Sequence, residues 1–140
     1  MQFTHEISDD SGQITSLVSL GKGFFATAST VASNQAGNIK IWEPNNVSPI
    51  ATITEDSCSI DFLLPIVQKN DVNIVYVCQN KLKCFNVKNM KPVPLFVNGE
   101  DIAITAICHN QQNTNVISLG LADGKIKDFD LSQKQKKVIR

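Results

Sequence analysis

Apolar and polar residues alternate with a period of two in many short runs along this chain. Such alternation is typical of half-buried β-strands, and no stretch carries the wider apolar spacing of an amphipathic helix. The runs are separated by residues that favour turns. These are Gly21 with Gly23, Asn45 with Asn46, Asn70 with Asp71, Asn89, and Asp123 with Gly124. The pattern predicts an all-β chain without helices.

One aromatic residue recurs at nearly equal intervals. Trp42, Phe85 and Phe129 are separated by 43 and then 44 residues, and each lies inside a strand-like run. An apolar pair precedes each aromatic and opens the unit. These pairs are Ile14 with Leu17, Ile60 with Leu63, and Ile104 with Ile107. Self-similarity at this period predicts three repeated units of four short strands each, and we expect each aromatic to be buried against the neighbouring unit.

The third unit has the most specific features. Residues 116–131, VISLGLADGKIKDFDL, contain two strand-like runs joined by an Asp123-Gly124 turn and end in an aromatic-acid pair. The first unit ends similarly at Trp42, and the second, more loosely, at Phe85. From residue 9 to residue 140 the chain resembles the WD-repeat β-propeller family. The resemblance implies three consecutive four-stranded antiparallel sheets, each forming one propeller blade.

The expected blades span about 9–55, 56–99 and 100–140 of a single propeller segment covering residues 1–140. Propellers close with about four to eight blades, so three cannot form a ring. The remaining blades would come from a longer chain, a second copy or a different protein, and we favour a longer chain. Residues 2–7 have the pattern of an outer strand that closes a blade elsewhere in the ring.

The chain departs from the family before the first strand of each unit. There the family often has a histidine, which joins a buried hydrogen-bond network with the turn aspartate and the tryptophan. Acidic pairs occupy these positions here, with no histidine in any unit. The pairs are Asp9 with Asp10, Glu55 with Asp56, and Glu100 with Asp101. We expect the network to be incomplete and the blades to depend more on apolar packing.

Because these acidic pairs share one phase of the repeat, we expect all six carboxylates on one rim of the channel. Such a rim would attract partner proteins with lysine- or arginine-rich segments. The alternative is that the acids are ordinary turn formers. Lysines also share a phase, on the third strand of each unit, and we expect them to be solvated edge residues. They are Lys40, Lys83 and Lys127.

The composition describes a soluble chain. It is 42% hydrophobic, and no apolar run approaches the roughly 20 residues that cross a bilayer. The acidic N-terminus does not resemble a signal peptide, so we expect an intracellular protein, cytoplasmic or nuclear. The four cysteines are then expected to be buried free thiols. They are Cys58, Cys78, Cys84 and Cys108.

No catalytic motif is found, and the two histidines, His5 and His109, lack the spaced partners of a metal site. We therefore expect no catalytic residue, metal or cofactor. The leading function is a non-catalytic scaffold that binds partner peptides or domains at its loops and channel face. A nucleic-acid-binding propeller is the alternative, opposed by the balance of 13 basic and 13 acidic residues. A propeller enzyme is less favoured, because the residues expected to line the channel, the apolar pairs that open the three units, offer no polar groups.

Overall fold

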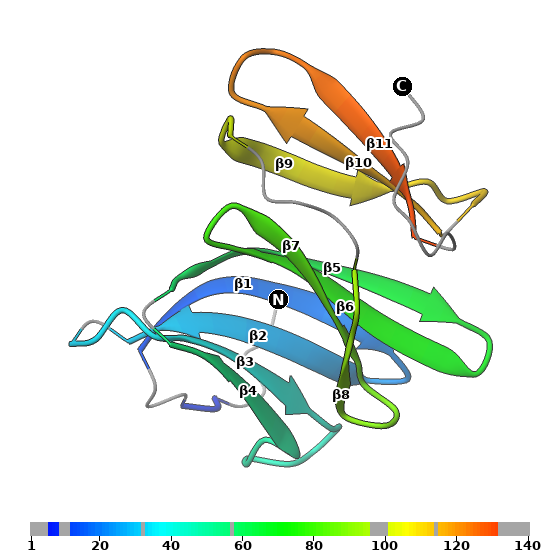
Figure 1. The fold of residues 1–140 in the computed structure, drawn as a ribbon. Helices are drawn as coiled ribbons and strands as arrows, with labels where there is room; N and C mark the ends of the chain where they lie inside the picture. Colours follow the sequence, from blue (N-terminus) through cyan, green and yellow to red (C-terminus); the bar gives the residue numbers. More distant parts are fainter. Residues whose placement is uncertain are drawn as a thin grey trace, which may run out of the picture.

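The computed structural model describes residues 6–8, 12–31, 33–56, 58–95, 101–113 and 115–131. Eleven strands of this part form three antiparallel sheets, each made of consecutive strands (Figure 1). The first sheet contains β1 (Gln13–Gly21), β2 (Phe24–Thr30), β3 (Gly37–Trp42) and β4 (Ala51–Glu55). The second contains β5 (Ile60–Gln68), β6 (Asp71–Cys78), β7 (Lys81–Asn86) and β8 (Lys91–Val93). The third contains β9 (Ile104–His109), β10 (Val116–Leu121) and β11 (Ile126–Asp130).

These sheets confirm the predicted all-β blade architecture, and the described residues contain no helix. The fourth strand expected in the third unit falls in residues 132–140, outside the described part. Of the outer strand expected at residues 2–7, only Glu6 and Ile7 are described, and neither lies in a strand.

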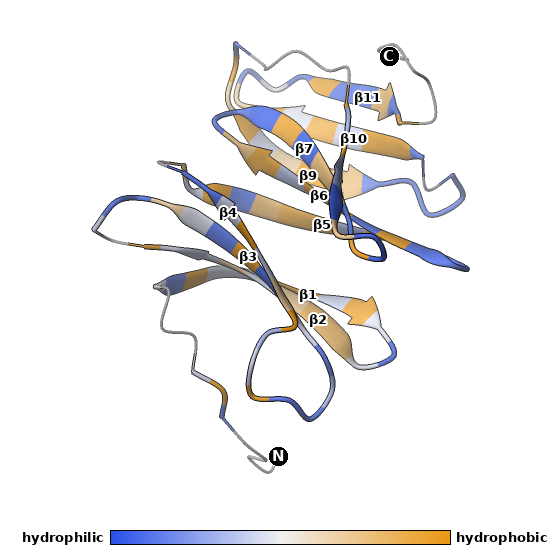
Figure 2. Ribbon diagram, turned by 60° about the horizontal axis from the view of Figure 1, so that its bottom comes forward, coloured by the Kyte–Doolittle hydropathy of each residue, from blue (hydrophilic) through white to orange (hydrophobic). Residues whose placement is uncertain are grey.

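The hairpins turn where glycine and asparagine allow a left-handed backbone. Gly21, Lys22 and Gly23 join β1 to β2 with φ values of 89°, 55° and 83°. Gln79 and Asn80 join β6 to β7 at φ 51° and 59°, as two-residue hairpins require. Figure 2 shows apolar residues gathered in the strands and hydrophilic ones at the turns. Local turn chemistry therefore sets the hairpin connections.

The sheets stack face against face, and a hydrophobic core fills each interface. Between the first and second sheets, Ala28 and Ile41 meet Ile74 and Phe85. Successive residues of β6 point to opposite faces, so Val75 belongs to the other core, between the second and third sheets. The second blade is thereby covered on both faces, and β6 becomes fully buried from Ile74 to Cys78.

The repeated aromatics are buried, as expected, but not all in the same setting. Phe85 lies in the core between the first two sheets, and Phe129 lies in the core between the last two. Trp42 is only 2% exposed, yet it pairs with Phe25 on the face of the first sheet that points away from the second. Its ring stacks on Phe25 with centroids 6.0 Å apart. Packing against a neighbouring blade is thus confirmed for Phe85 and Phe129 only.

The two end blades carry exposed apolar side chains. In the first blade, Ile14 and Leu17 of β1 are 42% and 64% exposed, although we expected them to line the channel with the other opening pairs. In the third, Ile126 is 62% exposed. Ser118 and Asp128 form a hydrogen-bonded pair at the register position where the second blade has apolar Val75 and Cys84.

The expectation of four buried free thiols is wrong for three cysteines. Cys58 and Cys78 form a disulfide, with Cα atoms 6.1 Å apart. The pairing of Ile60 with Cys78 at the start of β5 brings these two residues together. Cys108 is free but exposed, because it pairs with Ser118 on the face of the third sheet that points away from the second, whereas Cys84 is free and buried.

Candidate interaction site at the connection rim

The links between blades and the turns after β2, β6 and β10 lie at one end of the sheets. The first strand of each blade starts there, since Ile60 pairs with Cys78 and Ile104 with Leu121. We call this end the connection rim. It consists of residues 55–59 and 101–103 and the turns at 31–36, 79–80 and 122–125, as far as these are described.

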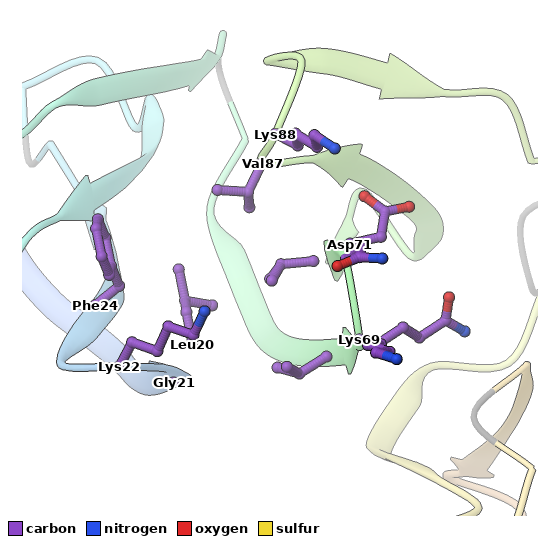
Figure 3. A pocket seen from close by; sticks show the side chains of 12 residues that line it. Leu20, Gly21, Lys22, Phe24, Lys69, Asp71, Val87 and Lys88 are labelled. Atoms are coloured by element: carbon purple, nitrogen blue, oxygen red, sulfur yellow. The ribbon is translucent and has the colours of Figure 1, made fainter.

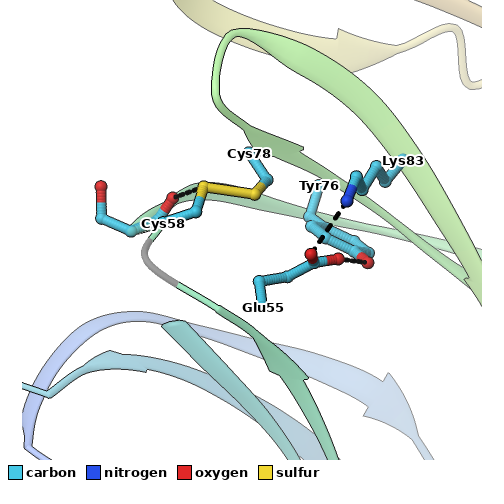
Figure 4. Close-up of polar contacts among 6 residues, drawn as sticks. Glu55, Cys58, Tyr76, Cys78 and Lys83 are labelled. Atoms are coloured by element: carbon cyan, nitrogen blue, oxygen red, sulfur yellow. Dashed lines mark hydrogen bonds and ion pairs between the residues drawn. A yellow bond between two sulfur atoms is a disulfide. The ribbon is translucent and has the colours of Figure 1, made fainter. Parts of the chain in front are cut away.

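Glu55 ends β4 and reaches across to the second blade (Figure 4). The Tyr76 hydroxyl donates a hydrogen bond to Glu55 Oε1 over 2.6 Å, and Lys83 Nζ lies 2.8 Å from Oε2. Burial of the phenol raises the pKa of Tyr76, and the hydrogen bond and charge of Glu55 raise this pKa further. Tyr76 therefore remains a donor, and Lys83 is ion-paired where a solvated edge residue was expected.

A groove of about 370 Å³ opens beside this cluster. Its walls include Glu55, Lys83 and, from the outer part of the second blade, Val93 and Leu95. Its lining combines charged and apolar groups.

The structure describes three of the six acidic residues expected at the rim. Asp56 and Asp101 are exposed, one on the link before β5 and the other on the link before β9. Glu55 is directed into the interface between blades by its two partners. The other three lie outside the described residues: Asp9, Asp10 and Glu100.

Asn80 is a rim residue that sequence reasoning did not single out. Its side-chain NH₂ donates to the carbonyl of Ile102 over 3.0 Å, and its Oδ1 accepts from the Ile104 amide over 2.8 Å. The turn of the second blade therefore holds the link that leads to the third. A turn at this position was readable from the sequence, but the residues it would contact were not.

The side chains of the described residues bear on the sequence-based expectations about histidine and cysteine chemistry. No three His, Cys, Asp or Glu side chains gather there into a group that could hold a metal ion. Cys108 and His109 face opposite sides of β9, as expected for neighbours on a strand, and His5 lies outside the described part. Within the described ranges, no helix has the length and apolar character needed to span a membrane.

A solved structure decides the fold. The C-terminal WD40 domain of Sif2 superposes with a TM-score of 0.70 at 15% sequence identity, over 94% of this chain and 36% of that one. The chain has the fold of WD40 propeller blades. It spans little more than a third of the Sif2 domain chain that it matches. No family model matches the sequence, and no curated protein does.

The WD40 blades of this chain replace the missing histidine network in different ways. In the first blade, Trp42 Nε1 donates to Thr27 Oγ1 over 3.0 Å. Thr27 lies opposite the lysine on the third strand of its blade. The residue opposite the equivalent lysine is Tyr76 in the second blade and Leu119 in the third. Tyr76 makes the contact to Glu55, and Leu119 is fully buried in the core.

The predicted Asp123-Gly124 turn is confirmed between β10 and β11. Gly124 has φ 87°, and Asp123 Oδ1 accepts a hydrogen bond from the Lys125 amide over 3.1 Å. This bond lowers the pKa of Asp123; desolvation opposes it, and the charge of Lys125 adds to the lowering. In this blade the aspartate thus stabilises its own turn.

Proposed function

We propose that this WD40 segment is a non-catalytic scaffold whose connection rim binds basic segments of partner proteins. The WD40 fold supports a protein-interaction role in general. The observation that carries the finer proposal is the exposure of Asp56 and Asp101 on the links before two successive blades. The Glu55 cluster and its groove lie on the same rim and offer partly apolar contact area.

Charge at this rim acts mainly on the rate and selectivity of association. An exposed ion pair contributes about 0.2–1 kcal/mol, so the acids alone give little affinity. They raise the rate at which a basic segment encounters the rim, and this effect is screened by salt. Apolar contacts then supply most of the affinity.

The test removes charge without changing side-chain shape. A protein captured by the full chain is purified, and its association rate is measured at low and high salt with Asp56→Asn and Asp101→Asn combined. We expect the low-salt rate to fall about two- to tenfold and the high-salt rates to converge. Glu43→Gln is the matched control, because Glu43 follows β3 at the opposite end of the strands and the glutamine keeps an acceptor for Asn46. An unchanged rate at low salt would leave the two acids as turn formers.

We further propose that the end blades bind other propeller blades, most simply from a longer chain. Ile14, Leu17 and Ile126 give both ends exposed apolar area, which stacked blades would cover. This arrangement would bury the first and third blades on both faces, as the second already is.

A further inference from the structure

A second groove opens between the first and second blades, at the end opposite the connection rim (Figure 3). Its volume is about 390 Å³. One wall is the β1–β2 hairpin with Leu20, Lys22 and Phe24, and the other wall carries Val87 and Lys88 after β7. The β5–β6 turn completes it. Grooves of this size, apolar with a few placed charges, are typical ligand sites.

The floor of this groove, which we call the hairpin groove, is the edge of the core between the two blades. Leu20 belongs to that core and is 5% exposed. Phe24, Val72 and Val87 pack against the same core and are half-buried. Val67, at the mouth, is 49% exposed. An apolar side chain entering here would extend an existing core and lose its contact with water.

The charges around the floor are predominantly positive. Lys22, Lys69 and Lys88 line the groove and are all exposed. In the described part of the chain, no carboxylate forms an ion pair with any of them. Asp71 is the one acid in the lining, and its Oδ1 already accepts a hydrogen bond from Asn86 over 2.6 Å. The three ammonium groups are thus free for an external anion.

The hairpin that carries Lys22 is held in a fixed conformation. The three turn residues from Gly21 to Gly23 have left-handed φ angles, which favour glycine at both flanks. A Cβ on Gly23 would lie 2.6 Å from Pro44 Cγ, so the hairpin packs closely on the loop after β3. Lys22 therefore lies beside the groove on a hairpin that packs against the loop after β3.

We propose that the hairpin groove binds an acidic peptide of a partner protein, with an apolar side chain on the floor and aspartate or glutamate beside the lysines. The apolar floor favours a peptide with an apolar side chain, and the lysines favour a peptide that also carries aspartate or glutamate. The connection rim, with exposed Asp56 and Asp101, favours the opposite charge. The two ends of this segment thus bind different partners and can be occupied together.

The probe is the hexapeptide amide Asp-Glu-Leu-Leu-Glu-Asp with fluorescein on its N-terminal amine. It is titrated with the full 140-residue chain, and binding is followed by fluorescence anisotropy. We expect saturable binding that weakens as salt is added. On the unchanged protein, replacing both leucines of the peptide by serine, or its four acids by their amides, should each weaken binding at least about fivefold. Equal binding of either altered peptide would overturn the proposal.

Protein variants then locate the binding. Combining Lys22→Glu, Lys69→Glu and Lys88→Glu should weaken binding at least about tenfold, because three attractions become repulsions. The control is Lys81→Glu with Lys125→Glu, which changes exposed lysines at the rim end and should alter affinity less than about twofold. Equal losses in both variants, or no binding to the unchanged protein at about 1 mM, would refute the groove as the site. These outcomes are independent of the rim experiment, which uses other residues and a basic partner.

Discussion

Replacing Tyr76 by phenylalanine removes one hydroxyl from the contact between the first and second blades. The ring lies in the core and is 4% exposed, so its packing is retained. The hydroxyl donates to Glu55 Oε1 over 2.6 Å, and Lys83 still reaches the other oxygen at 2.8 Å. The change therefore isolates a single hydrogen bond to a carboxylate.

A hydrogen bond to a charged group contributes about 1.5–3 kcal/mol. The Glu55 side chain is only 18% exposed, so water replaces the lost donor incompletely. We expect Tyr76→Phe to lower the free energy of unfolding by about 2 kcal/mol. Lys83 is 41% exposed, so Lys83→Met should cost less than about 1 kcal/mol.

The contact also makes stability depend on pH. Because the pKa of Tyr76 is raised in the folded chain, the folded state holds the phenol proton more firmly than the unfolded chain does. This contribution is complete below the unfolded tyrosine pKa of about 10 and is lost as the pH rises above it. In Tyr76→Phe, the free energy of unfolding should therefore fall less steeply with rising pH. The loss of stability that comes from the titration of other groups should remain.

Urea denaturation followed by circular dichroism measures both effects. The unchanged chain, Tyr76→Phe, Glu55→Ala and the double variant form a cycle whose coupling energy should reach about 1 kcal/mol or more. Repeating the cycle between about pH 9 and 11 tests the titration. A loss below about 0.5 kcal/mol for Tyr76→Phe, or strictly additive effects, would show that this bond does not hold the blades together.

Two further variants and one measurement on the unchanged chain test the fold and its assembly. Trp42→Ala should cost about 3–5 kcal/mol because the indole is buried, and solvent-exposed indole fluorescence in the unchanged chain would contradict this. Replacing Cys58 and Cys78 by serine opens a link with a sequence separation of 20 residues and should cost about 3 kcal/mol; equal urea midpoints would refute it. Sedimentation of the isolated chain should show a dimer or larger assembly, since Ile14 and Leu17 are exposed, and a well-folded 15.4 kDa monomer would oppose the proposed covering of the end blades.

The sequence by itself determined the local structure and the repeat. Alternating apolar residues specify strands, and the Asp123-Gly124 turn specifies its hairpin, because both depend on neighbours in the chain. The recurrence of Trp42, Phe85 and Phe129 identified three units, and a large residue at one phase is what a stacked sheet buries. The phase also fixes the face, since each of the three aromatics lies on the side of its sheet that points away from the following blade. The described chain places a sheet on that side for Phe85 and Phe129 only.

Only the tertiary structure decided which distant side chains meet. Glu55 belongs to the same set of acidic pairs as the exposed Asp56 and Asp101, yet it contacts Lys83, 28 positions along the chain, because the second blade stacks on the first. The same stacking places Cys58 by Cys78 and gathers the lysines of the hairpin groove from separate turns. Strand periodicity fixes the side of a sheet on which a residue lies, but these contacts depend on the distance and angle between sheets, which no local pattern encodes.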